Sequence, residues 1–374
     1  MTYDVIIIGG GLTGSAAAHY LALDGVPSLL LEQADLNSAA SGFNAGSLHL
    51  QIPHDPFMEL GDDWARRFSA IIPLLQDSIA LWRRAVEETG EDLEIRTPGG
   101  ILIADTEAQM RDLDRKAQIE RAAGLAPEIL SPADLRERMP YLSTRLAGGL
   151  FCAGEGKANP LISGPAFARS AARHGADIRR GVRVRHIVRE DDQYVVHTDH
   201  EAFRTRRLIN AAGAAVSDIS EMLGMRLDVQ KFPIQLSVTE PAEPFIHHLV
   251  YSAGQKLTLK QTPLGTVLIG GGWEADLDSQ GRPVVNPDSL ARNLGVALGA
   301  VPDLGSLNLI RTWAAFVNGN ASWMPIIGEP VPGYYVSYVP WIGFTAGPMA
   351  GRIAADMAQG KPTQTRADLS LFRP

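Results

Sequence analysis

The chain has 374 residues, of which 45% are hydrophobic and 20% charged, and its formal net charge is −8. These values are ordinary for a globular protein, and the length is sufficient for two domains with separate cores. The negative charge and the lack of a long basic run argue against a nucleic-acid partner. We interpret the local groups of arginines at residues 179–185 and 204–207 as a solvated edge of a β-rich region.

Cys152 is the only cysteine, which excludes an internal disulfide and a cysteine-ligated iron–sulfur or zinc centre within this chain. A single thiol suits a reducing compartment. The first strand is expected to begin at Tyr3, which leaves no room for a signal peptide, and no apolar run approaches the roughly 20 residues that span a bilayer. We therefore expect a cytoplasmic protein without a transmembrane segment. No group of histidines and acids has metal-ligand spacing, so no metal is expected.

The N-terminal region carries the most specific motif. Residues 5–8 form an apolar, β-branched run, as expected for a strand buried in a parallel sheet. Gly9, Gly11 and Gly14 follow with the spacing of a dinucleotide-binding turn, in which they permit the turn, the approach of a pyrophosphate and close packing of helix on strand. A helix is expected over residues 15–22, and its free N–H groups would hold the phosphates.

A second strand is expected at residues 28–31, and Glu32 stands at its end, eighteen residues after Gly14. A carboxylate in this place accepts the ribose hydroxyls of an adenosine and would repel a 2′-phosphate. The glycine motif alone would be weak, but strand, glycines, helix, strand and acid in register predict a dinucleotide site.

Small and polar residues dominate the stretch from Asn37 to Ser47, which is longer than a simple connection requires. Beside a dinucleotide site they indicate either backbone pressed against the cofactor or a flexible surface loop. Residues 63–88 are expected to be helical, and Pro73 should kink this helix or split it in two.

The middle of the chain is rich in predicted strands. A hairpin is expected between residues 194–198 and 206–210, and residues 230–239, 256–260 and 266–270 are expected to form a second, antiparallel sheet. Because two segments of one nucleotide site can be far apart in sequence, the nucleotide-binding domain is expected to be discontinuous.

The C-terminal region contains a second glycine-rich turn. A strand is expected at residues 334–338, followed by a turn over residues 341–347 and a helix from Pro348 to Gln359, because proline suits the first turn of a helix. The N-terminus of this helix would present backbone donors and positive potential to an anionic group.

Several of these segments resemble FAD-dependent amino-acid oxidoreductases of the D-amino acid oxidase superfamily, which includes glycine oxidase, sarcosine oxidase and the D-amino acid dehydrogenases. The similarity rests on the opening motif, Asn44-Ala45-Gly46, Val184, Ile209 to Gly213, Pro325 to Gly328, and Gly343 to Pro348. It spans nearly the whole chain with the segments in the right order. The pattern is closest to the catalytic β subunits of heteromeric opine, proline and sarcosine dehydrogenases.

The resemblance implies an α/β fold with a Rossmann-like FAD-binding domain of the glutathione-reductase type. It also implies a substrate domain with an antiparallel or mixed β-sheet and helices. The FAD-binding domain would comprise residues 1–84, 147–221 and 319–374, and the substrate-binding domain residues 85–146 and 222–318.

The resemblance further implies which residues contact the cofactor. The ribose would meet Glu32, the adenine region Val184, and the flavin ring the loop after Asn44 and the turn after Gly343. The implied FAD-binding residues are Gly9, Gly11, Leu12, Thr13, Gly14, Glu32, Gln33, Ser41, Asn44, Ala45, Gly46, Ser47, Val184, Ala212, Gly213, Gly343, Phe344, Thr345, Ala346 and Gly347. Relatives with a covalent flavin use a cysteine far beyond Cys152, so noncovalent FAD is expected here.

Two positions depart from the family pattern. Where glycine oxidase-like members hold the substrate carboxylate with an arginine, this sequence has Val317, and at a second basic position it has Trp341. With Trp273 at another substrate-facing place, the pocket is expected to be more aromatic and less cationic than an α-amino acid site. Lys260 and Arg311 are either partners for a substrate anion or ordinary surface or domain-interface charges.

These observations predict oxidation of the C–N bond of an amine, an imino acid or an opine-like N-substituted amino acid. A hydride would pass to flavin N5, the resulting imine would hydrolyse, and partner subunits with further redox cofactors would receive the electrons. The alternatives are a stand-alone D-amino acid, glycine or sarcosine-type oxidase that uses O2, an NAD-dependent dehydrogenase, and a flavin-carrying scaffold subunit.

The candidate catalytic residues follow from the same comparison. Trp273 and Trp341 are expected to exclude water, and Lys260 to meet an anion. Four histidines are either proton acceptors or structural residues, namely His49, His54, His247 and His248. The pair His247-His248 beside Tyr251 is preferred among them. The candidates are therefore Trp273, Trp341, His248 and Lys260.

Overall fold

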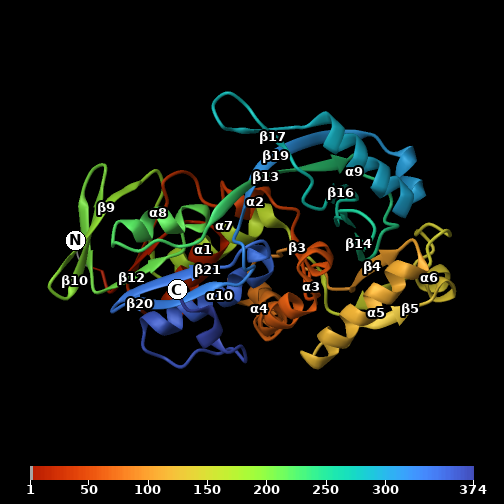
Figure 1. Ribbon diagram of the computed structural model, residues 1–374. Coiled ribbons are helices and arrows are strands. Elements are labelled where there is room, and N and C mark those ends of the chain that lie inside the picture. Colours follow the sequence, from red (N-terminus) through yellow and green to blue (C-terminus); the bar gives the residue numbers. More distant parts are fainter. Residues whose placement is uncertain (1–2) are drawn as a thin grey trace.

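The computed structural model describes residues 3–374 (Figure 1). Met1 and Thr2, which begin the range 1–84 assigned to the FAD-binding domain, lie outside the described part. Two large sheets form the framework, one of six strands and one of eight. Within residues 3–374, no helix combines the length and the apolar character needed to cross a membrane.

The six-stranded sheet has the order β20-β21-β12-β1-β2-β8. Its neighbouring strands run parallel except for β20, which pairs with β21 in the antiparallel sense. The strands are β1 (Val5–Ile8), β2 (Ser28–Leu31), β8 (Asp177–Arg179), β12 (Arg207–Asn210), β20 (Ile326–Val331) and β21 (Tyr334–Tyr338). In register, Ile8 lies between Leu31 and Asn210, so the carboxyl ends of the three central strands meet at one edge.

The central strands are buried on both faces, as their uninterrupted apolar sequences predict. On one face Val5, Ile7 and Leu30 share a core with the helices α1, α4, α7 and α10; on the other, Ile6, Ile8, Leu29 and Leu31 pack against α8, β9 and β10. The helices are α1 (Leu12–Leu23), α4 (Ile72–Thr89), α7 (Pro160–Arg173), α8 (Val216–Glu221) and α10 (Gly343–Ala358).

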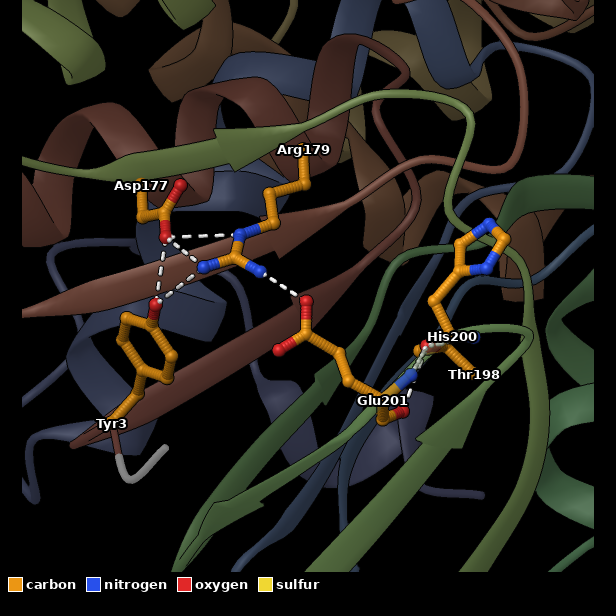
Figure 2. Close-up of polar contacts among 6 residues, drawn as sticks. All are labelled: Tyr3, Asp177, Arg179, Thr198, His200 and Glu201. Atoms are coloured by element: carbon orange, nitrogen blue, oxygen red, sulfur yellow. Dashed lines mark hydrogen bonds and ion pairs between the residues drawn. The ribbon is translucent and has the colours of Figure 1, made fainter.

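A separate three-stranded sheet of β9 (Val184–Glu190), β10 (Gln193–Thr198) and β11 (Ala202–Thr205) lies at one end of the molecule (Figure 1). Figure 2 shows how it is tied to β8: Arg179 contacts Glu201 at 2.6 Å and Asp177 at 3.0 Å. The Tyr3 hydroxyl donates to the same Asp177 carboxylate at 2.7 Å. Other arginines of this surface also pair with acids, which agrees with the solvated edge that the sequence predicted.

The eight-stranded sheet has the order β19-β13-β16-β15-β14-β4-β6-β5, and its neighbours are antiparallel except for β14 and β4. Its strands are β4 (Gly100–Ala104), β5 (Glu128–Leu130), β6 (Gly148–Cys152), β13 (Gln230–Thr239), β14 (Leu249–Ser252), β15 (Thr258–Gln261), β16 (Val267–Gly270) and β19 (Leu309–Gly319). Helices α5 (Glu107–Ala122), α6 (Pro132–Arg138) and α9 (Pro287–Ala300) lie on this half (Figure 1).

Two further helices and four short strands complete the framework. They are α2 (Ala40–Phe43), α3 (His54–Phe68) and the two-residue strands β3 (Ser47–Leu48), β7 (Gly156–Lys157), β17 (Asp276–Leu277) and β18 (Pro283–Val284). A 3₁₀ turn at Ser69–Ile71 separates α3 from α4, and Pro73 stands in the first turn of α4, so the predicted split of this helix is confirmed.

The predicted combination of a helix-covered parallel sheet with a second, mixed sheet is confirmed. Two local predictions were wrong. Residues 206–210 do not form a hairpin with 194–198, because β10 pairs with β9 and β11 while β12 joins β1 in the parallel sheet. The last helix begins at Gly343 rather than Pro348, which lies inside it. The domain boundaries stay a prediction; β6, within the range 147–221, lies in the eight-stranded sheet.

Candidate functional site

The turn between β1 and α1 brings backbone close to backbone. Gly9 adopts φ +108°, and a Cβ there would lie 2.5 Å from the carbonyl oxygen of Ala211, at the end of β12. A Cβ on Gly14 would overlap the carbonyl oxygen of Gly9. Helix α1 begins at Leu12; its N-cap residue, Gly11, has no side chain to cap it, and no acidic residue stands in its first turn. Its positive end is therefore available to a phosphate at the carboxyl edge of the sheet.

Glu32 stands directly after β2 at the same edge. Its Oε2 accepts the N–H of Gly10 at 2.7 Å and its Oε1 accepts the N–H of Ala34 at 2.8 Å. Each carboxylate oxygen has a second lone pair, so the side chain is held in place and still able to accept a ribose hydroxyl. Gln33 follows and accepts a hydrogen bond from Arg183 at 3.0 Å, one residue before Val184 opens β9.

The stretch after Glu32 forms a loop that is held in place by hydrogen bonds. Ser41, on α2, accepts the N–H of Leu12 at 3.1 Å and so ties the loop to the start of α1. The Asn44 amide donates to Ser41 O at 2.6 Å, while its oxygen accepts the N–H of Gly46 at 2.7 Å. Ala45 and Ser47 then reach a cavity that lies against the eight-stranded sheet. Of the two alternatives left open by the sequence, a backbone held against a ligand site fits these contacts.

The first turn of α10 faces the same cavity. It has no side-chain cap and no acidic residue in its first turn, and Phe344 and Thr345 line the cavity. The Thr345 hydroxyl accepts the backbone N–H of His49 at 2.9 Å, so the helix start is fixed to β3 and the residue that follows it. Gly343, Ala346 and Gly347, which the sequence analysis placed in a turn before the helix, belong to α10 itself. A Cβ on Gly347 would lie 2.6 Å from Leu12 Cδ2, which explains the close contact of α10 with α1.

The cavity has a volume of about 540 Å³ and lies against β13, β15 and the start of α10. Its walls are largely apolar and aromatic. Among the described residues that line it are Asn44, Ser47, His49, Phe232, Ile234, Lys256, Thr258, Glu274, Val317, Trp341 and Phe344. Of these, Lys256 is the one lysine or arginine, and it pairs with Glu274 at 3.8 Å.

Two titratable groups, His49 in the lining of this cavity and Lys260 behind Ser47, have unusual proton affinities. Burial and then the charge of Lys260 lower the pKa of His49 to about 3. Burial and then the charge of Lys157 lower the pKa of Lys260 to about 7. Lys260 is 1% exposed and donates to the Ser47 hydroxyl at 2.6 Å. Strongly shifted pKa values in a cavity are typical of functional sites.

The predicted catalytic residues are only partly brought together. Trp341 lines the cavity, and Lys260 lies behind Ser47. Trp273 lines a neighbouring cavity of about 480 Å³, and its indole donates to Lys256 O at 2.6 Å. His248 lies away from both cavities and is hydrogen-bonded to Tyr141 at 2.8 Å. Val317, at the position of the expected arginine, lines the cavity, whereas Arg311 is exposed and lies over Trp313.

Sequence reasoning missed part of the lining. Phe232, Ile234 and Leu236 alternate along β13 and share the face toward the cavity, a period-two pattern that was present in the sequence. Tyr251 lies behind His49, and Glu155 lies behind Tyr251. No local pattern connects residues so far apart in the chain.

The same architecture occurs in characterised proteins. Residues 4–357 match the DAO family, described as FAD dependent oxidoreductase. The chain is 27% identical to the beta subunit of sarcosine oxidase from Rhizobium meliloti (strain 1021), covering 99% of this chain and 88% of that protein. It is also 27% identical to the B subunit of opine oxidase from Rhizobium meliloti, and the match covers 99% of this chain and 96% of that protein. The crystal structure of glycine oxidase from Geobacillus kaustophilus superimposes with a TM-score of 0.83 at 24% sequence identity. The superposition covers 100% of this chain and 98% of that chain.

The residues at the edge of the parallel sheet fit an FAD. The glycines whose Cβ atoms would collide with backbone, the positive end of α1 and the Glu32 carboxylate suit a pyrophosphate and an adenosine ribose. The uncapped start of α10 lies at the other end of this region, beside the cavity. With the family match over nearly the whole chain, the conclusion is that this protein belongs to the DAO family of FAD-dependent oxidoreductases.

Proposed function

We propose that the protein oxidises the C–N bond of a secondary amine, an imino acid or an opine-like N-substituted amino acid, and that it is the catalytic subunit of a dehydrogenase complex. The observation that carries the substrate class is the lining of the 540 Å³ cavity. Val317 and Trp341 occupy the positions where a basic side chain would hold the carboxylate of a simple amino acid. Lys256, the cation of the lining, is already paired with Glu274.

The chain's own residues would position the amine and keep water away. Trp341, Phe232 and Phe344 form aromatic walls that exclude solvent from the reacting carbon. The first turn of α10 offers backbone donors and positive potential to an anionic group. When bound, noncovalent FAD would supply the hydride acceptor, N5, and the imine left by the amine would be hydrolysed by water.

The partner proposal rests on relatives. Two of the similar proteins are named as subunits, one of a sarcosine oxidase and one of an opine oxidase. We infer that other subunits with further redox cofactors receive the electrons from this chain. A stand-alone oxidase using O2 is the alternative, favoured by the structural similarity to glycine oxidase. The cytoplasm is inferred as the compartment from the single cysteine.

We keep the domain division 1–84, 147–221 and 319–374 for FAD and 85–146 and 222–318 for the substrate as part of this proposal. The cofactor-binding residues named from the sequence are likewise proposed. Among the candidate catalytic residues, the cavity favours Trp341 and Lys260, while Trp273 and His248 stay sequence predictions.

An anaerobic absorbance titration of the FAD-loaded protein tests the proposal. Amino acids, N-methyl amino acids, proline and opines are added in turn, followed by air and then by an artificial electron-accepting dye. Bleaching of the flavin by N-substituted substrates but not by simple amino acids is the expected result. Recovery only with dye supports a dehydrogenase that needs a partner, whereas fast recovery in air supports an oxidase. A flavin that no amine bleaches, even in the complete assembly with its partner subunits, would refute amine oxidation and favour the scaffold subunit.

A further inference from the structure

Two cavities of the protein share part of their walls. The 540 Å³ cavity beside the start of α10 and the 480 Å³ cavity beside α3 are both lined by Lys256 and Glu274. These two side chains, which form an ion pair at 3.8 Å, therefore lie at the boundary between the two spaces. We call the first space the inner cavity and the second the outer cavity.

The outer cavity opens toward solvent. Met58, Glu59 and Arg292 in its lining are exposed, and the Glu274 side chain at the boundary is 84% exposed. A compact amine such as sarcosine or proline would occupy the inner cavity and leave the outer one without a role. An amine with a longer substituent on nitrogen would extend from the inner cavity into the outer one.

The ion pair at the boundary is easily opened. Its separation of 3.8 Å is longer than a hydrogen bond, and both side chains reach solvent, Lys256 being 41% exposed. Exposed ion pairs of this kind contribute little to stability. A carboxylate that approached Lys256 to hydrogen-bond distance would displace Glu274, because a short charge-assisted hydrogen bond is stronger than a loose pair.

The backbone on both sides of the boundary is fixed. The Trp273 indole donates to the Lys256 carbonyl oxygen at 2.6 Å. The Trp273 carbonyl oxygen accepts the N–H of Gln235 at 3.0 Å, and Glu274 forms a β-bridge with Ile234, so this segment is held along β13. Opening the boundary therefore requires rotation of two side chains and no movement of the chain.

The other charges of the outer cavity restrict what can enter it. Arg292 forms no ion pair with an acid of the described residues 3–374, whereas Asp55 and Glu59 add two carboxylates to the lining. A carboxylate is therefore accepted only beside Lys256 or Arg292. A side chain that passes the two acids should be uncharged or basic.

We propose that Lys256 binds the carboxylate on the N-substituent of an opine-like substrate in exchange for Glu274, and that the outer cavity takes the side chain of that substituent. The inference rests on the proposed function and deepens it, since it selects N-(1-carboxyalkyl) amino acids from the proposed classes. The amine nitrogen stays in the inner cavity. Lys256 is thereby a specificity-determining residue, and Trp273 is a positioning residue that fixes its backbone.

The connectivity of such a substrate explains why Lys256 does not serve a simple amino acid. In a simple amino acid the carboxylate is bonded directly to the carbon that is oxidised. A carboxylate on Lys256 would then keep this carbon at the boundary, away from the aromatic walls of Trp341, Phe232 and Phe344, which line only the inner cavity. In an N-(1-carboxyalkyl) amino acid, one carbon and the nitrogen separate the bound carboxylate from the carbon that is oxidised.

The first test measures binding without oxidation. The probe is 2,2′-thiodipropionate, which has two carboxylated arms and a sulfur in place of the amine. Calorimetric titration of the FAD-loaded protein should show an about tenfold higher Kd in Lys256→Met, the equivalent of one charge-assisted hydrogen bond. Lys256→Arg should keep part of the affinity. Glu274→Gln should lower the Kd, because it removes the anion that competes for Lys256.

The opposite signs of these two effects distinguish competition from a structural role. If the ion pair only stabilised the cavity wall, breaking it from either side would weaken binding. Lys361→Met is the matched control for the lysine, since its side chain is 45% exposed and pairs with Asp24 at 3.1 Å. Glu221→Gln is the control for the acid, which is 54% exposed in a pair of 3.9 Å. Neither control should change the Kd.

The second test compares matched substrates by anaerobic reduction of the flavin. N-(1-carboxyethyl)alanine and N-isopropylalanine differ only in that a methyl group replaces one carboxylate. At subsaturating concentration the wild-type protein should react about tenfold faster with the dicarboxylate, and Lys256→Met should lose most of this preference. FAD content and melting temperature control for folding.

A variant of the outer cavity tests where the side chain of the substituent lies. Ser289 lines the outer cavity but not the inner one, so Ser289→Phe should fill part of the outer space alone. It should raise KM for N-(1-carboxyethyl)norvaline more than for N-(1-carboxyethyl)alanine, whose methyl group is short. An equal effect on both substrates would overturn the role of the outer cavity.

The outcomes separate the two proposals. A Kd for 2,2′-thiodipropionate that is unchanged in Lys256→Met, or that rises in both Lys256→Met and Glu274→Gln, would overturn the role of Lys256 whether or not an amine is oxidised. Equal reduction rates with the two matched substrates would overturn the substrate class but leave amine oxidation intact. Reduction by none of the amines, even in the complete assembly, would refute the proposed function, whereas calorimetry still decides the role of Lys256.

Discussion

Gly319 and the indole of Trp341 are in such close contact that a Cβ on Gly319 would overlap the indole atoms Cε2 and Cζ2. Trp341 adopts φ +58°, and Trp323, stacked on it at 4.6 Å, adopts φ +63°. Positive φ values are uncommon for bulky residues and are strained, of the order of 1–3 kcal/mol each. Phe232 also packs against Trp341, with 4.6 Å between the ring centroids. The wall of the cavity is therefore a strained stack that the missing side chain of Gly319 makes possible.

Gly319→Ala should displace Trp341 and open this wall. We expect FAD content to be retained, the near-ultraviolet circular dichroism of the stacked tryptophans to decrease, and KM for the amine to rise more than kcat falls. Gly295→Ala is the matched control, because a Cβ on Gly295 in helix α9 meets nothing within 4 Å. An unchanged dichroism spectrum in Gly319→Ala would mean that Trp341 does not depend on this contact.

Gly14→Ala should abolish FAD binding. The added Cβ would overlap the Gly9 carbonyl oxygen, so α1 would have to move away from β1 and from the place of the pyrophosphate. The purified variant should be colourless and should melt at a lower temperature. Gly295→Ala should be neutral or stabilising by up to about 1 kcal/mol, since alanine is the better helix former. A yellow Gly14→Ala protein with normal FAD affinity would contradict the assigned phosphate site.

Glu32→Gln should weaken FAD binding without unfolding the protein. The amide replaces one carboxylate oxygen by a donor, so a ribose hydroxyl or one of the N–H groups of Gly10 and Ala34 loses its acceptor. Hydrogen bonds to charged groups contribute about 1.5–3 kcal/mol, which corresponds to a roughly 10- to 150-fold higher Kd. Titration of the apoprotein with FAD measures this Kd.

The control for Glu32→Gln is Asp35→Asn. This variant removes the same charge three residues further along the chain. The Asp35 side chain is exposed and pairs with Arg180 at 3.4 Å. Equal Kd values for the two variants would show that Glu32 acts only through the net charge.

Lys260→Met should change how stability depends on pH. The pKa of Lys260 is lowered to about 7 in the folded protein, by burial and then by Lys157, but should be near 10.4 in the unfolded chain. Below pH 7 Lys260 is protonated in both the folded and the unfolded state. The free energy by which the buried ammonium destabilises the folded protein is therefore independent of pH in that range. Between pH 7 and about 10.4 only the unfolded chain holds it, and wild-type stability gains up to about 1.4 kcal/mol per pH unit from this group.

The stabilising effect of Lys260→Met should therefore be largest below pH 7 and shrink as the pH rises toward 9. Melting temperatures measured across this range test the slope. Lys231 is exposed, and Lys231→Met controls for the loss of a lysine as such. A difference between Lys260→Met and wild type that grows with pH would have the wrong sign and would show that Lys260 is not buried as a cation.

Local sequence patterns predicted the nucleotide-binding end well. Strand β1, the glycine turn and strand β2 are encoded within about thirty consecutive residues, and Glu32 follows at once. The loop from Asn37 to Ser47 was also recognised as unusual. In these places propensity, turn chemistry and burial all favour the same structure.

The errors come from places where distant contacts decide the structure. Residues 207–210 have strand propensity, but only the neighbouring β1 determines that they enter the parallel sheet. Pro348 suits a first helical turn, yet α10 begins five residues earlier because Gly347 and Gly351 let it pack against α1. The contact of His49 with Tyr251 joins residues 202 positions apart, and no spacing rule connects them.

The contact between α1 and α10 also determines when this protein becomes functional. A Cβ on Gly351 would lie 2.6 Å from Thr13 O, so the last α-helix packs directly on the first turns of α1. Domains generally begin to fold as they emerge during synthesis, N-terminal parts first. Here α1 appears among the first 23 residues, but the helix that covers it is complete only at residue 358. We therefore expect nascent chains to remain without FAD until residue 358 has left the ribosome and α10 has packed on α1.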